Sequence, residues 1–234
     1  MFEKMRDTWT KAIQPLVVRM GDLDPSVLTW TSLVISLAAF YLLAIAGLDS
    51  TGSMMIVGAV ILVLVAGVLD AMDGALARHQ GTAGPYGDFL DHSIDRIVDI
   101  GLIVAIGYNT AFVIDPIAGY AAALLTLLGS YMGTQAQSVG LGRLYGGFSR
   151  ADRLVITLVG LIWAAYQAGT GSAGIDISSI HEYANCALLG NAKLNGMTLA
   201  LAVSFWGGIY TFLVRFIETR KRLLASWFII QNEP

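Results

Sequence analysis

Carboxylates are concentrated in one short stretch of an otherwise apolar chain. Between residues 70 and 99 the sequence has only two basic residues, Arg78 and Arg96, against six aspartates: Asp70, Asp73, Asp88, Asp91, Asp95 and Asp99. Oxygen ligands in this number suit magnesium, manganese or calcium. The stretch therefore predicts a divalent-metal site, in which two ions about 4 Å apart would neutralise the carboxylates and polarise a phosphate while orienting an attacking oxygen.

The rest of the composition is that of a membrane protein. Of 234 residues, 56% are hydrophobic and 13% are charged, and this charged share is about half that of a soluble domain. Most of the six uncharged stretches approach the roughly 20 residues that a helix needs to cross a bilayer. These stretches are Val27–Leu48, Ser50–Leu69, Ile100–Ile114, Pro116–Gly142, Leu154–Ile175 and Leu194–Val214. The third is long enough only if its helix begins among the carboxylates. We therefore expect an all-α integral membrane protein with six transmembrane helices.

Basic residues predict the orientation of these helices. With the N-terminus in the cytoplasm, 12 of the 14 Lys and Arg residues fall at cytoplasmic ends, and only Arg96 and Lys193 do not. We therefore expect an integral protein of the cell (plasma) membrane, with both termini and the carboxylates on the cytoplasmic side. The expected division is an N-terminal amphipathic juxtamembrane segment with an interfacial helix over 1–26, a six-helix domain over 27–222 and a cytoplasmic tail over 223–234.

Several functions are disfavoured by composition. The single Cys186 excludes a disulfide within the chain, and three histidines do not supply a zinc-type ligand set. A net charge of −3 gives no basic footprint for nucleic acid. A cation transporter that uses the acidic cluster is an alternative to an enzyme, but its carboxylates should be distributed through the membrane depth. Here they are grouped at one end of two neighbouring spans, which favours an enzyme.

The spacing of the carboxylates predicts how they meet. Asp70 and Asp73 share one face at the end of the second span, and Asp91 and Asp95, four residues apart, share a face at the start of the third. The intervening HQGTAGPY is typical of a tight turn, so the two spans would form a hairpin with the carboxylate pairs facing each other. Small residues nearby could serve close helix packing, but beside the carboxylates they favour room for a bulky, phosphate-bearing ligand. They are Gly74, Ala77 and Gly87.

Written as a pattern, residues 70–95 read D-x2-D-G-x2-A-R-x8-G-x3-D-x3-D. This pattern resembles the signature of the CDP-alcohol phosphatidyltransferases. All eight fixed positions are met, by Asp70, Asp73, Gly74, Ala77, Arg78, Gly87, Asp91 and Asp95. Upstream, LDPSVLTWTSL resembles the Pro-x3-Thr segment of that family at Pro25 and Thr29.

The resemblance implies a reaction and a role for each signature residue. An alcohol hydroxyl would attack the β-phosphate of a CDP-linked lipid, CDP-diacylglycerol or CDP-archaeol, and release CMP. Asp70, Asp73 and Asp91 would hold two divalent ions, Mg²⁺ or Mn²⁺, and Asp95 would complete the metal site and act as the catalytic base. The nucleotide would be bound by Asp70, Gly74, Ala77, Arg78 and Gly87. A homodimer through the membrane helices is also implied.

The acceptor alcohol is less closely defined. The inner segment GLGRLYGGFSRADRL has three arginines, Arg143, Arg150 and Arg153, which would either bind an acceptor phosphate or face anionic lipid. SYMGTQAQSVGLG with the following SRADRL resembles the branch that uses inositol phosphate, although that branch tends to have basic residues where this chain has Gly133 and Gln135. We therefore expect inositol phosphate, with glycerol phosphate, serine or another small alcohol as alternatives.

Overall fold

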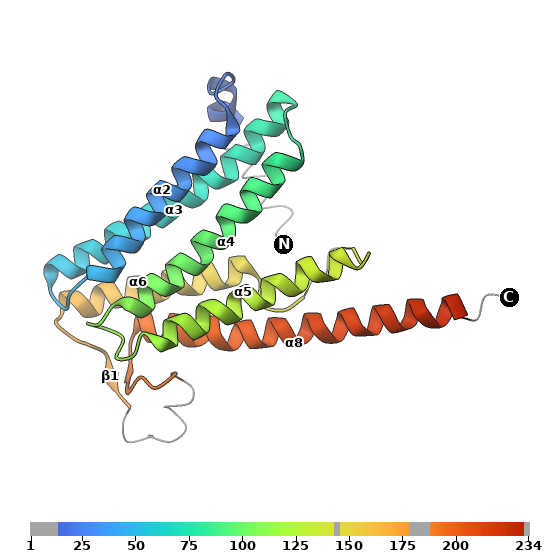
Figure 1. Ribbon diagram of the computed structural model, residues 1–234. Helices are drawn as coiled ribbons and strands as arrows, with labels where there is room; N and C mark the ends of the chain where they lie inside the picture. Colours follow the sequence, from blue (N-terminus) through green and yellow to red (C-terminus); the bar gives the residue numbers. More distant parts are fainter. Residues whose placement is uncertain (1–13, 143–145, 178–187, 232–234) are drawn as a thin grey trace.

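The computed structural model describes residues 14–142, 146–177 and 188–231 and is built almost entirely from helices (Figure 1). The long helices are α2 (Pro25–Ile45), α3 (Ser50–Gln80), α4 (Pro85–Tyr108), α5 (Ile117–Ser138), α6 (Arg150–Gly169) and α8 (Gly196–Gln231). Two short strands, β1 (Ile175–Asp176) and β2 (Lys193–Leu194), pair antiparallel between α6 and α8. The turn between α3 and α4 lies at the opposite end of the molecule from β1 (Figure 1).

Four helices in the described chain are long and apolar enough to cross a membrane: Pro25–Ile45, Ser50–Gln80, Ile117–Ser138 and Gly196–Ala225. Their outer faces present large apolar side chains, such as Val34 at 65% exposure and Leu124 at 64%, which suits contact with lipid. The two remaining long helices are more polar. Helix α4 has five charged residues, and α6 has three in its first turn. The all-helical membrane fold is therefore confirmed, whereas the expected count of six spans stays a prediction.

The hairpin between α3 and α4 is closed by its local sequence. Gly81 ends α3 with φ of 70°, a left-handed conformation that glycine adopts without strain. Thr82 donates its backbone N–H to the carbonyl of Ala77 at 2.9 Å, and Pro85 begins α4, where its missing N–H costs nothing. The Gln80 side chain also donates to the backbone of residues 21 and 23, at 2.9 and 2.8 Å, which ties the segment before α2 to this turn.

Helix ends differ from the expected limits of the uncharged stretches. Helix α3 continues eleven residues beyond Leu69, and α8 runs through Gln231 into the segment expected as a tail. Residues 14–19 are helical, and Val17 packs on Leu28, Met72 and Leu76. Residues 1–13, in the expected interfacial segment, lie outside the described residues, as do residues 178–187 between the fifth and sixth uncharged stretches. Because α3 reaches Gln80 and α4 begins at Pro85, all eight signature residues lie on helices rather than in the turn between them.

Small residues allow the helices to approach closely. Helix α6 packs on α3 and α8, and α5 packs on α4 and α8. A Cβ added at Gly160 of α6 would stand 2.5 Å from the carbonyl oxygen of Gly196 in α8. Gly107 and Gly119 make a similar backbone contact between α4 and α5. Such contacts are common between membrane helices, because small residues let backbones pack together.

Gly160→Ala should destabilise the fold, since the added methyl group forces the backbones of α6 and α8 apart. We expect a loss of about 1–3 kcal/mol, the usual cost of overpacking. Thermal unfolding of the purified protein in detergent micelles measures it. Gly67→Ala in α3 is the matched control, because nothing lies within 4 Å of the added Cβ. An equal effect of the two substitutions would contradict the close packing of α6 on α8.

Candidate active site

The end of α3 and the start of α4 bring three carboxylates together. One oxygen each from Asp70, Asp73 and Asp91 lies within 4.8 Å of the other two. Asp73 is only 6% exposed, whereas Asp70 and Asp91 are partly open. Two come from one helix and the third from the next, so the hairpin itself creates the group. Hard oxygen donors at this separation suit a divalent cation.

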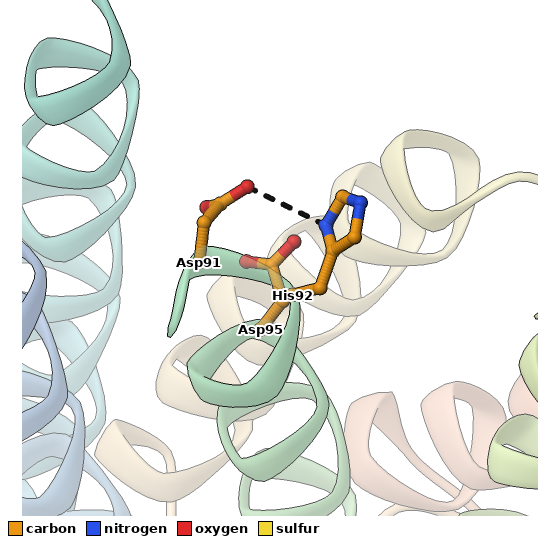
Figure 2. A group of neighbouring side chains, drawn as sticks. All are labelled: Asp91, His92 and Asp95. Carbon is orange, nitrogen blue, oxygen red and sulfur yellow. Dashed lines mark ion pairs between the residues drawn. The ribbon is translucent and has the colours of Figure 1, made fainter. Parts of the chain in front are cut away.

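A second group lies beside the first on α4. Asp91, His92 and Asp95 each offer a ligand atom within 4.8 Å of the others, and Figure 2 shows the three side chains side by side at the start of the helix. The Nδ1 atom of His92 is 3.5 Å from Oδ2 of Asp91, but the His92 side chain is 65% exposed. Asp95, in contrast, is only 8% exposed. Asp91 belongs to both groups, which makes them one continuous acidic site.

Asp73 is held by its neighbours. The Thr29 hydroxyl, on α2, donates to Oδ2 of Asp73, and the backbone N–H of Gly74 donates to Oδ1. Thr29 is itself 4% exposed, so this contact is shielded from water. Fixing a carboxylate in this way orients its remaining lone pairs for a ligand. The upstream Pro-x3-Thr segment therefore reaches the same site as the main signature.

Arg150 contacts carboxylates of both helices from the first turn of α6. Its Nη2 lies 2.7 Å from Oδ1 of Asp95, its Nε 2.9 Å from Oδ1 of Asp99, and its Nη1 3.6 Å from Oδ2 of Asp70. The contact with Asp95 is an ion pair without hydrogen-bond alignment. One guanidinium thus offsets part of the negative charge, and the remaining carboxylates still favour a cation.

A cavity of about 1090 Å³ surrounds the acidic site. All eight signature positions line it: Asp70, Asp73, Gly74, Ala77, Arg78, Gly87, Asp91 and Asp95. The segment from Gly21 to Ser26 and the α3–α4 turn complete its walls. This volume is just above the usual range for ligand sites, about 300–1,000 Å³, so the cavity accommodates a large ligand.

Two signature glycines have different structural effects. A Cβ on Gly87 would meet nothing within 4 Å, so this position keeps open space at the cavity wall. A Cβ on Gly74 would instead stand 3.2 Å from Nη1 of Arg78. Gly74 therefore makes room for the guanidinium of Arg78, which itself faces the cavity.

A second cavity, of about 710 Å³, lies on the other side of Arg150. Four arginines line it: Arg96, Arg150, Arg153 and Arg215. Ser130, Tyr131, Thr134 and Gln137 of α5 add polar groups. Asp88 and Arg150 line both cavities, so the two are adjacent. Of the three arginines expected to bind an acceptor, Arg150 and Arg153 lie here, and Arg143 falls outside the described residues.

Arg215 is a basic residue of this cavity that the sequence did not reveal. It comes from α8 and donates through Nη1 to the carbonyl oxygen of Gly129 in α5, at 2.8 Å. A Cβ on Gly133 would stand 3.1 Å from Nη1 of Arg215. The guanidinium of Arg215, which comes from another helix, therefore lies beside the space that a side chain at position 133 would occupy. Only the close packing of α5 on α8 reveals this, because no local pattern links the two residues.

Comparison with known proteins agrees with the site. The family model described as CDP-alcohol phosphatidyltransferase matches residues 23–206, which include α2 to α6 and the complete signature. The chain belongs to the CDP-alcohol phosphatidyltransferase family. Membership makes this chain a phosphatidyltransferase and leaves no support for a cation transporter.

Relatives of this phosphatidyltransferase share most of its length. An archaetidylinositol phosphate synthase of Pyrococcus horikoshii is 31% identical over 72% of this chain and 86% of its own length. Another, from Methanothermobacter thermautotrophicus, is 32% identical over 68% of this chain and 76% of its own. The phosphatidylinositol phosphate synthase of Mycobacterium tuberculosis with CDP-DAG bound has the same fold, with a TM-score of 0.63 at 23% identity, covering 90% of this chain and 92% of that one.

Asp73→Asn should weaken binding of a divalent ion, because it removes the buried oxygen donor from the group of three carboxylates. We expect the dissociation constant for Mn²⁺ to rise at least tenfold, as calorimetric titration of the purified phosphatidyltransferase would show. Asp88→Asn is the control, since Asp88 lines the cavity but belongs to neither group of ligand atoms. Unchanged Mn²⁺ affinity in Asp73→Asn would exclude Asp73 as a ligand.

Proposed function

We propose that this enzyme transfers the phosphatidyl-type group of a CDP-linked lipid to inositol phosphate and releases CMP. The single observation that carries the proposal is the pair of adjacent cavities, one acidic with the whole signature and one lined by four arginines. The curated relatives named archaetidylinositol phosphate synthase support the choice of acceptor. So does the M. tuberculosis enzyme, a phosphatidylinositol phosphate synthase whose structure contains CDP-DAG.

The arginine-lined cavity favours a phosphorylated acceptor. Guanidinium groups bind phosphate through paired hydrogen bonds, and four of them around one space exceed the need of a neutral alcohol. The hydroxyl and amide groups of Ser130, Thr134 and Gln137 would bind acceptor hydroxyls. Serine, which has no phosphate, fits this cavity less well. Glycerol phosphate shares the charge but offers fewer hydroxyls than inositol phosphate.

The acidic site would hold two divalent ions, Mg²⁺ or Mn²⁺. Asp70, Asp73, Asp91 and Asp95 would be the ligands, and a related structure, that of the M. tuberculosis enzyme in complex with manganese and citrate, supports this metal class. Bound divalent ions would supply stabilisation of negative charge on the transferred phosphate and on departing CMP.

The protein side chains would guide the transfer itself. The acceptor oxygen attacks the lipid-linked β-phosphorus, a new P–O bond forms, and the P–O bond to CMP breaks. Asp95 takes the proton of the attacking hydroxyl, since it lines the first cavity and contacts Arg150, which lines both cavities. The nucleotide is bound by Asp70, Gly74, Ala77, Arg78 and Gly87, all of which line the first cavity.

The membrane setting completes the proposal. Helices α4 and α6 cross the bilayer together with the four more apolar helices, and both termini face the cytoplasm of a cell-membrane protein. The distribution of 12 of 14 basic residues supports this orientation. Lipid chains then enter from the bilayer, whereas inositol phosphate and CMP use the cytoplasmic openings of the cavities.

The proposal predicts metal-dependent CMP release. Purified enzyme with Mg²⁺ or Mn²⁺ is incubated with CDP-diacylglycerol or CDP-archaeol and, in turn, inositol phosphate, inositol, glycerol phosphate and serine. We expect release with inositol phosphate to be at least tenfold faster than with inositol or serine. Asp95→Asn should reduce kcat by about 10²–10⁴-fold, the usual contribution of a general base.

Three results would contradict it. Chelation of the metal without loss of CMP release would exclude a metal-dependent transfer. Full activity of a folded Asp95→Asn protein would exclude Asp95 as the base. Faster reaction with glycerol phosphate than with inositol phosphate would retain the reaction class and replace the acceptor.

A further inference from the structure

Asp99 is a largely shielded carboxylate that the proposed reaction does not use. It lies on α4 one helical turn after Asp95, outside the eight signature positions. Its side chain is 11% exposed. It lines neither of the two cavities, so it would touch neither substrate. A carboxylate that is shielded from water is unfavourable unless it is paired, so the contacts of Asp99 with its neighbours must account for its place in the structure.

Asp99 contacts three of the four arginines of the second cavity. Its Oδ1 accepts from Nε of Arg150 at 2.9 Å. Its Oδ2 lies 3.4 Å from Nη2 of Arg153 and 3.5 Å from Nη1 of Arg96. Both carboxylate oxygens of Asp99 therefore contact arginines of the second cavity, although Asp99 itself does not line that cavity. The contacts join α4 to the first turn of α6, where the capping box of Ser149 and Asp152 fixes the helix start.

These arginines need a common anchor to act together. Three guanidinium groups around one space repel one another, and long flexible side chains would separate without a carboxylate between them. Two of these arginines also donate hydrogen bonds elsewhere. Nη1 of Arg96 donates to Ser130 Oγ at 2.6 Å, and Nη1 of Arg153 donates to the carbonyl oxygen of Phe148 at 3.3 Å. Asp99 is the contact that all three share.

Arg150 gives Asp99 a connection to both halves of the site. While Nε is held by Asp99, the terminal nitrogens Nη1 and Nη2 reach Asp70 and Asp95. Arg150 also lines both cavities. Asp99 therefore helps to orient the Arg150 guanidinium, which lies between the two cavities, although Asp99 itself lines neither of them.

We infer that Asp99 is the positioning residue of the acceptor site. It acts through Arg150 and Arg153, holding their guanidinium groups in the orientation that binds the acceptor phosphate. This inference rests on the proposed function, because it assumes a phosphorylated acceptor in the arginine-lined cavity. It adds a specific requirement: loss of the Asp99 charge affects the acceptor far more than the CDP-linked lipid. Arg153 and Arg96 line only the second cavity. Arg150 keeps its own contacts with Asp70 and Asp95.

The test separates the two substrates. Asp99→Asn should raise the KM for inositol phosphate at least tenfold, while the KM for the CDP-linked lipid changes less than twofold. Asp99→Glu, which keeps the charge on a longer side chain, should recover most of the lost affinity for inositol phosphate. Glu218→Gln is the matched control, since its side chain is 41% exposed, pairs with Arg222 one turn after Arg215 in α8 and lines neither cavity. It should leave both KM values within twofold of the wild type.

A merely structural role predicts another pattern. If Asp99→Asn changes both KM values equally, changes neither, or behaves like Glu218→Gln, the inference is wrong. Should Asp99→Asn fail to fold, Arg96→Gln is compared with Arg96→Gln/Asp99→Asn, in which the net charge of the wild-type cluster is restored. The double variant should still show the tenfold higher KM for inositol phosphate relative to Arg96→Gln, and equal KM values in the two would overturn the inference.

A binding measurement keeps this inference separate from the proposed function. The wild type and Asp99→Asn are titrated calorimetrically with inorganic phosphate in the absence of divalent metal, so that arginines rather than a metal site bind the anion. A tenfold weaker affinity in Asp99→Asn supports the positioning role even if the wild type does not use inositol phosphate. Equal affinity overturns the role even if CMP release proceeds as proposed.

Discussion

Ionised carboxylates repel one another and lose hydration when they are gathered at the end of membrane helices. Asp73 and Asp95 are each less than 10% exposed, and two further carboxylates lie beside them. Leaving such a group without cations would be strongly unfavourable. The surrounding structure supplies partial compensation, through Arg150 of α6 and the Thr29 hydroxyl of α2. The remaining charge is what makes a metal site at this position physically reasonable.

This requirement explains the arrangement of the helices around the hairpin. Helix α2 packs on α3 and α4 and brings Thr29 to Asp73, and α6 packs on α3 and brings Arg150 to the acidic site. Small residues such as Gly160 permit the close approach of α6 to α8. The arrangement also separates two chemical environments by one side chain. The signature carboxylates line the cavity on one side of Arg150, and three further arginines line the cavity on the other, which suits a donor that needs metal and an acceptor that has its own negative charge.

Much of the acidic site could be predicted from the sequence, because its spacing is local. Residues three and four apart share a helix face, and the Gly- and Pro-containing turn joins the two helices, so Asp70, Asp73 and Asp91 converge. The C-terminal end of α3 is harder to predict from the sequence. An apolar stretch ends at its first charge, whereas the helix continues through the signature to Gln80, where Gly81 stops it.

The arginine-lined cavity was only partly predictable, since tertiary contacts build it. The sequence identifies Arg150 and Arg153 as candidates for binding the acceptor. Arg215, in contrast, reaches the cavity from α8 and lies in the space beside Gly133. The sequence shows Arg96 as one of two basic residues among the aspartates but does not predict its place in this cavity. The importance of Asp99 depends on contacts with residues more than fifty positions away, which no pattern within α4 reveals.

The most direct test of the account is the position of bound manganese. Crystals of the enzyme grown with Mn²⁺ give anomalous diffraction that locates the ion independently of any assumption about its ligands. The account predicts anomalous density within about 2.5 Å of carboxylate oxygens of Asp70, Asp73 and Asp91, at the junction of α3 and α4. Manganese bound elsewhere, with these three side chains turned away from one another, would contradict it.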